Sequence, residues 1–180
     1  MDLTEKRLRS EPVYDGVLLH VRRDTVRLPD GETSVREWID HPGAAAVVPV
    51  HADGTVVLLR QFRYPLRREY LEVPAGKSDR HGEEPLALAR RELREETGLS
   101  AATWTPLGET HPGIGYSNEV IHLFLAEDLQ EHPDDQDADE FVVPVRLPLA
   151  EAVEKARRGE ILDGKSCVAL VLAQAALDRR

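Results

Sequence analysis

Apolar and polar residues form alternating or continuous segments of strand length along most of the chain. Residues 13–40 predict two or three strands, because VLLHVRRDTVRL and SVREWI are separated by residues 29–32 (PDGE), a composition typical of a turn. The runs AAAVVPV and TVVLLRQF flank residues 52–54 (ADG), which predicts a hairpin of central strands. Further strands are expected at residues 119–129 and within FVVPVRL.

Helical periodicity marks other parts of the chain. A helix of about three turns is expected between Pro85, which suits a first turn because it lacks an N–H, and Gly98, which suits the left-handed position past a helix end. The segment LAEAVEKARRG has apolar positions at helical spacing, and Ser166 to Leu177 predicts a largely apolar helix. Strands alternating with helices predict an α/β fold with a mixed sheet between helices.

Length and charge narrow the class of protein. With 180 residues the chain is expected to form a single domain. Its net charge of −10, from 33 acidic and 23 basic residues, argues against binding to nucleic acid or to an anionic membrane. The single cysteine, Cys167, lies in an apolar run, which is typical of a buried structural thiol. The sequence has no stretch of membrane-span length and no signal-peptide core, so we expect a cytoplasmic protein.

The densest chemistry lies on the predicted helix before Gly98. Glu92, Glu95 and Glu96 are three or four residues apart, so their carboxylates project from one side of the helix and repel each other. Carboxylate oxygens at this spacing suit Mg²⁺ or Mn²⁺ better than zinc. The alternative is a solvated helix face on which these glutamates simply pair with Arg91 and Arg94.

The spacing around these glutamates favours the catalytic interpretation. Gly76 is followed by six residues, then Glu83, seven more residues and the segment RELREETGL, which starts at Arg91. This pattern closely resembles the Nudix box, which implies a Nudix α/β/α sandwich and a structural role for Arg91 in orienting a glutamate by a salt bridge. The usual spacing has five residues after the glycine, so we interpret the sixth as a loop insertion within residues 78–82.

Flanking segments resemble the ADP-ribose and ADP-sugar pyrophosphatase branch of that family. The segment RQFRYP, residues 60–65, followed by EVPAG from Glu72 resembles the strand and loop that precede the box in that branch. The resemblance implies that an arginine here holds the diphosphate of the substrate, and it favours Arg63 over Arg60. Glu72 is a further candidate for substrate binding. The alternative is a surface arginine beside an acidic patch.

Two loops extend this resemblance. Residues 111–117 (HPGIGYS) resemble the Ser-Pro-Gly loop of ADP-ribose enzymes, although His111 replaces the serine. The acidic residues 134–140 stand where the branch has a loop with a further catalytic acid, which favours Asp137, with Glu140 second. A solubilising acidic loop is the alternative.

The N-terminal strands resemble the extension through which such enzymes dimerise. The resemblance implies an antiparallel β extension at residues 1–40, as part of the same unit as a Nudix hydrolase domain at residues 41–180, and a homodimer whose two chains build each site. Trp38 is a candidate for stacking or hydrogen bonding at the nucleoside. The alternative is a tryptophan in the core or the interface.

The resemblance also implies a mechanism. Glu92 and Glu96 would be the main metal ligands, Glu95 an additional ligand or bridging acid, and the backbone carbonyl of Ala75 would complete the coordination of Mg²⁺ or Mn²⁺. A water activated by the metals, or by an acid such as Asp137, would attack one phosphorus of the diphosphate. ADP-ribose would give AMP and ribose 5-phosphate.

Three alternatives stay open for the function. The substrate could be another nucleoside diphosphate sugar such as GDP-mannose, or an oxidised nucleoside triphosphate. A third alternative is a Nudix domain that senses ADP-ribose without cleaving it. Sensors of this kind usually carry a DNA-binding module and a degraded box, whereas this sequence has no basic module and keeps every box glutamate.

Overall fold

The strands of this chain form three sheets in a computed structural model that describes residues 1–78, 82–132 and 141–180. Two compact units are distinguished, and each is described by itself. No helix of the described residues is long and apolar enough to cross a membrane.

The first unit combines residues 1–43 with residues 113–119. Its sheet has the order β1-β2-β3 and is antiparallel throughout, with the strands β1 (Lys6–Asp15), β2 (His20–Arg27) and β3 (Thr33–Ile39). The expected antiparallel extension is therefore present. Strand β1 begins earlier than expected, because its charged sequence KRLRSE gave no apolar signal.

The turn before β3 forms at the predicted sequence. The N–H of Leu28 donates to the carbonyl of Glu32 at 2.8 Å, and Gly31 has a φ of 94°. This left-handed conformation favours glycine, because a Cβ would be strained there. The segment 113–119 joins the same unit through a hydrogen bond from the N–H of Ile39 to the carbonyl of Tyr116 at 2.8 Å.

The second unit contains residues 44–112 and 120–180 and has two sheets. The four-stranded sheet has the order β7-β4-β9-β8, and only β4 and β9 run parallel in it. The three-stranded sheet has the order β10-β5-β6 and is antiparallel. The strands are β4 (Ala44–Pro49), β5 (Thr55–Arg63), β6 (Arg68–Glu72), β7 (Ala75–Lys77), β8 (Leu99–Thr110), β9 (Ile121–Glu131) and β10 (Val142–Pro148), and a 3-10 turn (Tyr64–Leu66) joins β5 to β6.

The predicted hairpin of β4 and β5 is wrong in its pairing. The turn itself forms, with the N–H of Gly54 donating to the carbonyl of His51 at 2.9 Å. Beyond one bridge between Val50 and Val56, however, the strands enter different sheets. Strands β4 and β5 both have continuous apolar runs. Such runs are typical of strands buried on both faces, rather than of a hairpin with one face exposed to solvent.

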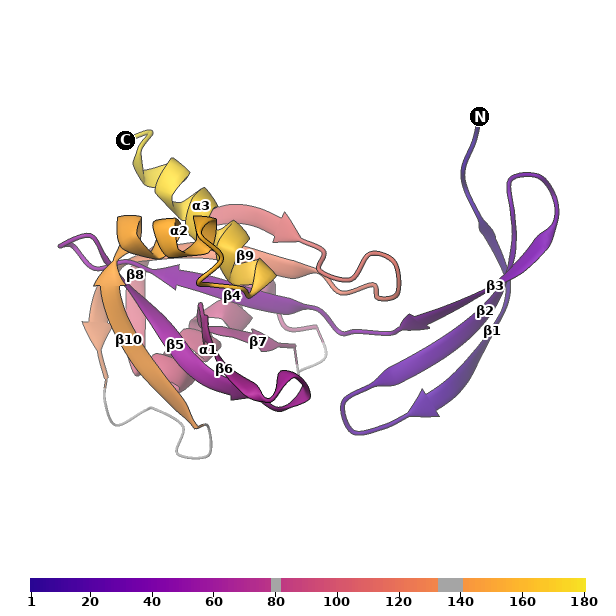
Figure 1. Cartoon of the computed structure of the whole chain (residues 1–180), viewed down its shortest axis with the longest axis horizontal. Helices are drawn as coiled ribbons and strands as arrows, with labels where there is room; N and C mark the ends of the chain where they lie inside the picture. Colours follow the sequence, from indigo (N-terminus) through magenta and orange to yellow (C-terminus); the bar gives the residue numbers. More distant parts are fainter. Residues whose placement is uncertain (79–81, 133–140) are drawn as a thin grey trace. The chain divides into compact units, whose positions relative to one another are not determined.

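Alternate residues of β4 face two separate cores, which explains the layered arrangement (Figure 1). Ala45 and Val47 pack with helix α1 (Pro85–Thr97). Ala46 and Val48 pack with helices α2 (Leu149–Arg157) and α3 (Gly164–Leu177) on the opposite side. The expected α/β/α sandwich with a mixed sheet is confirmed, since a strand of period two presents one set of residues to each helical layer.

Candidate active site

Helix α1 directs two of its glutamates inward. It begins at Pro85 and ends before Gly98, which has a φ of 67° and donates its N–H to the carbonyl of Arg94 at 2.8 Å. Leu93, on the same helix, is fully buried against the sheet. Glu92 and Glu96 are only 8% and 5% exposed, so the solvated-face alternative does not describe these two residues.

The backbone of β7 lies against both buried carboxylates. The N–H of Ala75 donates to Oε2 of Glu96 at 2.8 Å. A Cβ added to Gly76 would overlap the carboxyl group of Glu92. The first glycine of the box is thus the residue that lets the strand approach the helix, and both carboxylates lie against β7.

Arg91 connects the glutamates of the box. Its Nη1 lies 2.8 Å from Oε1 of Glu92 and 2.7 Å from Oε2 of Glu95, and its Nε lies 3.2 Å from Oε1 of Glu83. The pKa of Arg91 is raised, and the hydrogen bond to Glu83 is the largest cause. Burial opposes this shift, and the hydrogen bond to Glu95 adds to it. Glu83 therefore reaches Arg91 despite the extra residue in the preceding loop, of which residues 79–81 lie outside the described residues.

A second charged cluster lies at the end of β6. Glu72 is 4% exposed and accepts two hydrogen bonds from Arg63, from Nε at 2.6 Å and from Nη2 at 2.7 Å. The ammonium group of Lys165 also donates to Glu72, and it donates to Asp163 at 2.9 Å. These four residues line a cavity of about 300 Å³ together with Tyr70 and two leucines.

Lys165 and Asp163 were not predicted as site residues from the sequence. Asp163 is the N-cap residue of α3 and accepts a hydrogen bond from the N–H of Ser166 at 3.0 Å. Asp is favoured at this position because its carboxylate can accept from an N–H of the first helical turn. The sequence DGKS could therefore have predicted the helix start. Nothing in the sequence indicates that this turn meets Glu72, which is 93 residues earlier than Lys165.

The Glu72 cluster predicts a defined acid dependence of stability. Burial alone would raise the pKa of Glu72, but the hydrogen bonds and charges of Arg63 and Lys165 lower it from 4.5 to about 2. The charged form of Glu72 therefore contributes its full stabilisation of the fold above pH 4.5, and this contribution is lost as the pH falls toward 2. We expect Glu72→Gln to be less stable than wild type at neutral pH, with a difference that shrinks over this interval in urea unfolding.

The control for this acid titration is Glu69→Gln. Glu69 is exposed and lies 3.4 Å from Arg60, so its loss should have a small effect at every pH. A stability difference for Glu72→Gln that is the same at pH 7 and near pH 2 would contradict the assignment.

Of the four remaining predicted residues, the structure describes two, Arg60 and Trp38. Arg60 is exposed on β5 and pairs with Glu69 rather than with Glu72. Trp38 is half-buried on β3 in the first compact unit. Asp137 and Glu140 lie outside the described residues.

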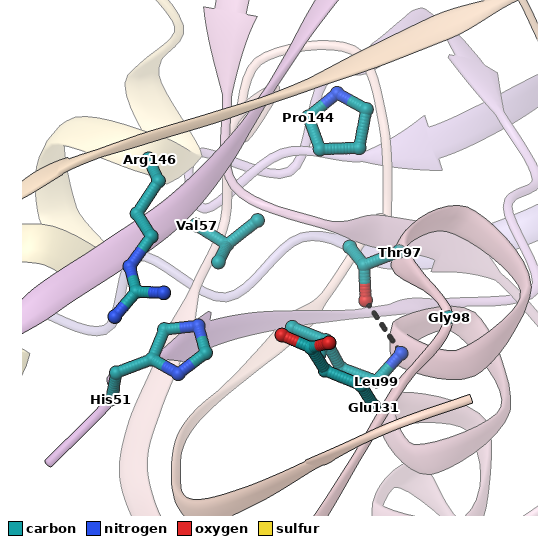
Figure 2. A pocket seen from close by; sticks show the side chains of 8 residues that line it. All are labelled: His51, Val57, Thr97, Gly98, Leu99, Glu131, Pro144 and Arg146. Carbon is teal, nitrogen blue, oxygen red and sulfur yellow. Dashed lines mark hydrogen bonds between the residues drawn. The ribbon is translucent and has the colours of Figure 1, made fainter. Parts of the chain in front are cut away.

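Another cavity, of about 250 Å³, contains none of the predicted site residues (Figure 2). His51, Glu131 and Arg146 line it, and burial is the largest cause that lowers the pKa of His51, followed by the charge of Arg146. The guanidinium of Arg146 is paired with Asp53 at 2.8 Å. Among the described residues that line this cavity, Glu131 is the only carboxylate, so the cavity has no pair of acids like Glu92 and Glu96. We therefore place the candidate site at α1 and β7.

The donor set at α1 and β7 fits a hard divalent cation. No group of three His, Cys, Asp or Glu side chains in the described ranges is arranged to hold a metal by itself. Mg²⁺ does not require such a cage, because it is commonly held by one or two carboxylates together with waters and substrate phosphates. Glu92 and Glu96 are two buried carboxylates beside the backbone of Ala75, which meets that lesser requirement.

Models of two protein families match successive parts of the chain. Residues 40–165 match the family described as NUDIX domain, and residues 5–39 match the family described as nucleoside diphosphate sugar hydrolase N-terminal domain. The chain is 38% identical to an ADP-ribose pyrophosphatase of Bacillus subtilis (strain 168), over 96% of this chain and 94% of that protein. It is 37% identical to a methanol dehydrogenase activator of Bacillus methanolicus, over 94% of this chain and 92% of that protein.

More distant similarities extend to another substrate and to a solved structure. A GDP-mannose pyrophosphatase of Yersinia enterocolitica is 34% identical, over 82% of this chain and 83% of that protein. The crystal structure of an ADP compounds hydrolase aligns with a TM-score of 0.85 at 24% identity, covering 99% of this chain and 97% of that one. This structural likeness supports the α/β/α fold.

Proposed function

We propose that this chain, which belongs to the Nudix family, hydrolyses the diphosphate bond of a nucleoside diphosphate sugar, and that ADP-ribose is the substrate. The observation that carries the proposal is the pair of buried glutamates, Glu92 and Glu96, held against the backbone of β7. Burying two carboxylates one helical turn apart costs stability, so their burial here supports a chemical role. The similarity to an ADP-ribose pyrophosphatase over nearly the whole chain supports the substrate.

The chemistry requires a divalent cation, for which we propose Mg²⁺ or Mn²⁺. When bound, the cation neutralises phosphate oxygens and lowers the pKa of a coordinated water. Glu92, Glu96 and the carbonyl of Ala75 would hold it, with Glu95 as an additional ligand or bridging acid. Arg91 keeps Glu92 and Glu95 oriented through its ion pairs.

The remaining residues would bind the substrate and move the proton. Arg63 is half-exposed, and we propose that its free edge binds the diphosphate while Glu72 holds the other edge. The proton of the attacking water passes to Glu95 or to an acid of the loop 134–140, for which Asp137 is the first candidate and Glu140 the second. Trp38 would contact the nucleoside.

We also propose that the chain forms a homodimer through residues 1–40. Three apolar side chains of the first unit's sheet, Val13, Tyr14 and Val35, are 47%, 58% and 53% exposed. A sheet that leaves such residues uncovered offers a surface for a second chain. The cytoplasmic location stays a prediction from the sequence.

Product analysis tests the proposed reaction. Purified protein would be incubated with ADP-ribose, ADP-glucose, GDP-mannose and 8-oxo-dGTP, with Mg²⁺ or Mn²⁺ and with EDTA as control. We expect metal-dependent release of AMP and ribose 5-phosphate, with ADP-ribose as the preferred substrate. Preferential cleavage of GDP-mannose would contradict ADP-ribose as the substrate and support GDP-mannose instead. The similarity to the Yersinia GDP-mannose pyrophosphatase is the reason to test it. Binding of ADP-ribose without cleavage of any substrate would refute hydrolysis and favour a sensor.

A further inference from the structure

We propose that Lys165 is a positioning residue, which fixes Glu72 and thereby orients the guanidinium of Arg63 toward the diphosphate. The inference rests on the proposed function for its consequence in catalysis. Its structural part, that Lys165 orders Arg63 through Glu72, can be tested without any substrate.

The Arg63 guanidinium has two edges with different surroundings. Nε and Nη2 both donate to Glu72, in the bidentate geometry that fixes the plane of an arginine. Nη1 makes no hydrogen bond to another residue in the described part of the chain. Because the Arg63 side chain is 44% exposed, this second edge is available to an anionic ligand in the cavity.

Glu72 is held by two cationic residues, Arg63 and Lys165. Its carboxylate is buried, and burial without sufficient partners would favour the neutral acid. Lys165 donates to Oε2, the same oxygen that accepts from Nη2 of Arg63. The lysine therefore fixes the position of the oxygen that sets the orientation of the guanidinium. After Arg63, it also helps to lower the pKa of the buried carboxylate.

Lys165 is placed to act on Glu72 rather than to bind the substrate directly. Its side chain is only 12% exposed, and its ammonium group is engaged by both Glu72 and Asp163. Asp163 is in turn held at the start of α3 by the N–H of Ser166. The lysine is thus anchored from the helix side and acts on the cavity through Glu72.

The charge of Lys165 works in the same direction. Arg63 and Lys165 balance Glu72 and Asp163, so the four-residue cluster is close to neutral. Without the lysine, the cluster would have a net negative charge beside the edge of Arg63 that is to bind a diphosphate. Loss of Lys165 should therefore weaken binding of an anionic substrate both by disorder of Arg63 and by repulsion.

The kinetic test compares Lys165→Met with two other variants. We expect Lys165→Met to raise the KM for ADP-ribose by roughly 10-fold or more, with kcat nearly unchanged, because a small misplacement of a binding group is costly. Lys165→Arg should recover most of the loss, since it restores a buried donor with positive charge. Lys155→Met is the matched control, because Lys155 on α2 pairs with Glu151 and with Glu160, and none of the three lines the cavity.

A second readout does not depend on hydrolysis. The Nε–Hε resonance of Arg63, assigned by its loss in Arg63→Lys, should exchange slowly with water in wild type and become broad or fast-exchanging in Lys165→Met. A sharp, protected resonance in a folded Lys165→Met protein would overturn the proposal, as would an unchanged KM. If wild type cleaves no nucleoside diphosphate sugar, the proposed function fails, and this resonance alone decides the positioning role. If Lys165→Met does not fold, Lys165→Gln is measured in the same way.

Discussion

Replacing Glu96 with glutamine is expected to remove most of the turnover without lowering the melting temperature. The carboxylate lies at the position proposed for a metal ligand, and an amide oxygen is a weaker ligand that cannot accept the proton of a water. We expect kcat to fall by roughly 10²-fold or more, the range attributed to a positioned catalytic carboxylate. The measurement is AMP release from ADP-ribose at saturating Mg²⁺.

The stability of the same variant tests the electrostatic argument. Glu96 is buried and lies one and four residues from Glu95 and Glu92, so the like charges of these glutamates repel one another. Glutamine keeps an oxygen that can accept the N–H of Ala75, the bond that Glu96 makes at 2.8 Å. We therefore expect Glu96→Gln to melt no lower than wild type.

A matched control separates these effects from a general loss of charge on α1. Glu84 precedes the helix, is exposed and makes no capping hydrogen bond with its side chain. Glu84→Gln should change neither kcat nor the melting temperature. A strongly destabilised Glu96→Gln protein would refute the claim that the glutamates are held together against their repulsion, and retained turnover would remove Glu96 from the site.

The sequence was sufficient to predict α1 because its signals are local. Pro85 and Gly98 limit the helix, and the spacing of Glu92 and Glu96 places their side chains on one side of it. Their burial was not predictable from that spacing alone. It depends on β7, which approaches so closely that only glycine fits at position 76.

Pairing between distant segments was harder to predict. A turn signal at residues 52–54 indicated correctly that the chain reverses, but not that β4 would pair with β7 and β9 instead of β5. Strand β8 was missed because its apolar residues are few and Pro106 and Gly108 interrupt it at a bulge. Local propensity identifies where a chain turns, whereas strand partners are chosen by tertiary packing.

The charged cluster around Glu72 illustrates the same limit for the candidate site. Arg63 and Glu72 could be named from their resemblance to a known pattern close to the box. Lys165 joins this cluster only through the fold, because the start of α3 lies beside the end of β6. The roles of all three in binding stay predictions until the kinetic and resonance measurements are made.

Replacing Gly76 with alanine is expected to damage both stability and activity. The backbone of Gly76 is not in the left-handed region, so the cost comes from the overlap of the new Cβ with the carboxyl group of Glu92 rather than from backbone strain. Relief requires β7 and α1 to separate or Glu92 to leave its position. We expect a loss of about 1–3 kcal/mol in the free energy of unfolding, as for overpacking in a close-packed interior, together with loss of turnover.

A double-mutant cycle with Glu92→Ala identifies the cause of that damage. If the overlap is responsible, removing the Glu92 carboxyl makes room for the new methyl group, and Gly76→Ala should then cost little further stability. Turnover should stay lost in Glu92→Ala and in the double variant, since the proposed metal ligand is missing from both. Arg91 retains Glu83 and Glu95 as partners in these variants, so the helix keeps most of its charge pairing. Additive losses of stability in the cycle would show that Gly76 is required for some reason other than its contact with Glu92.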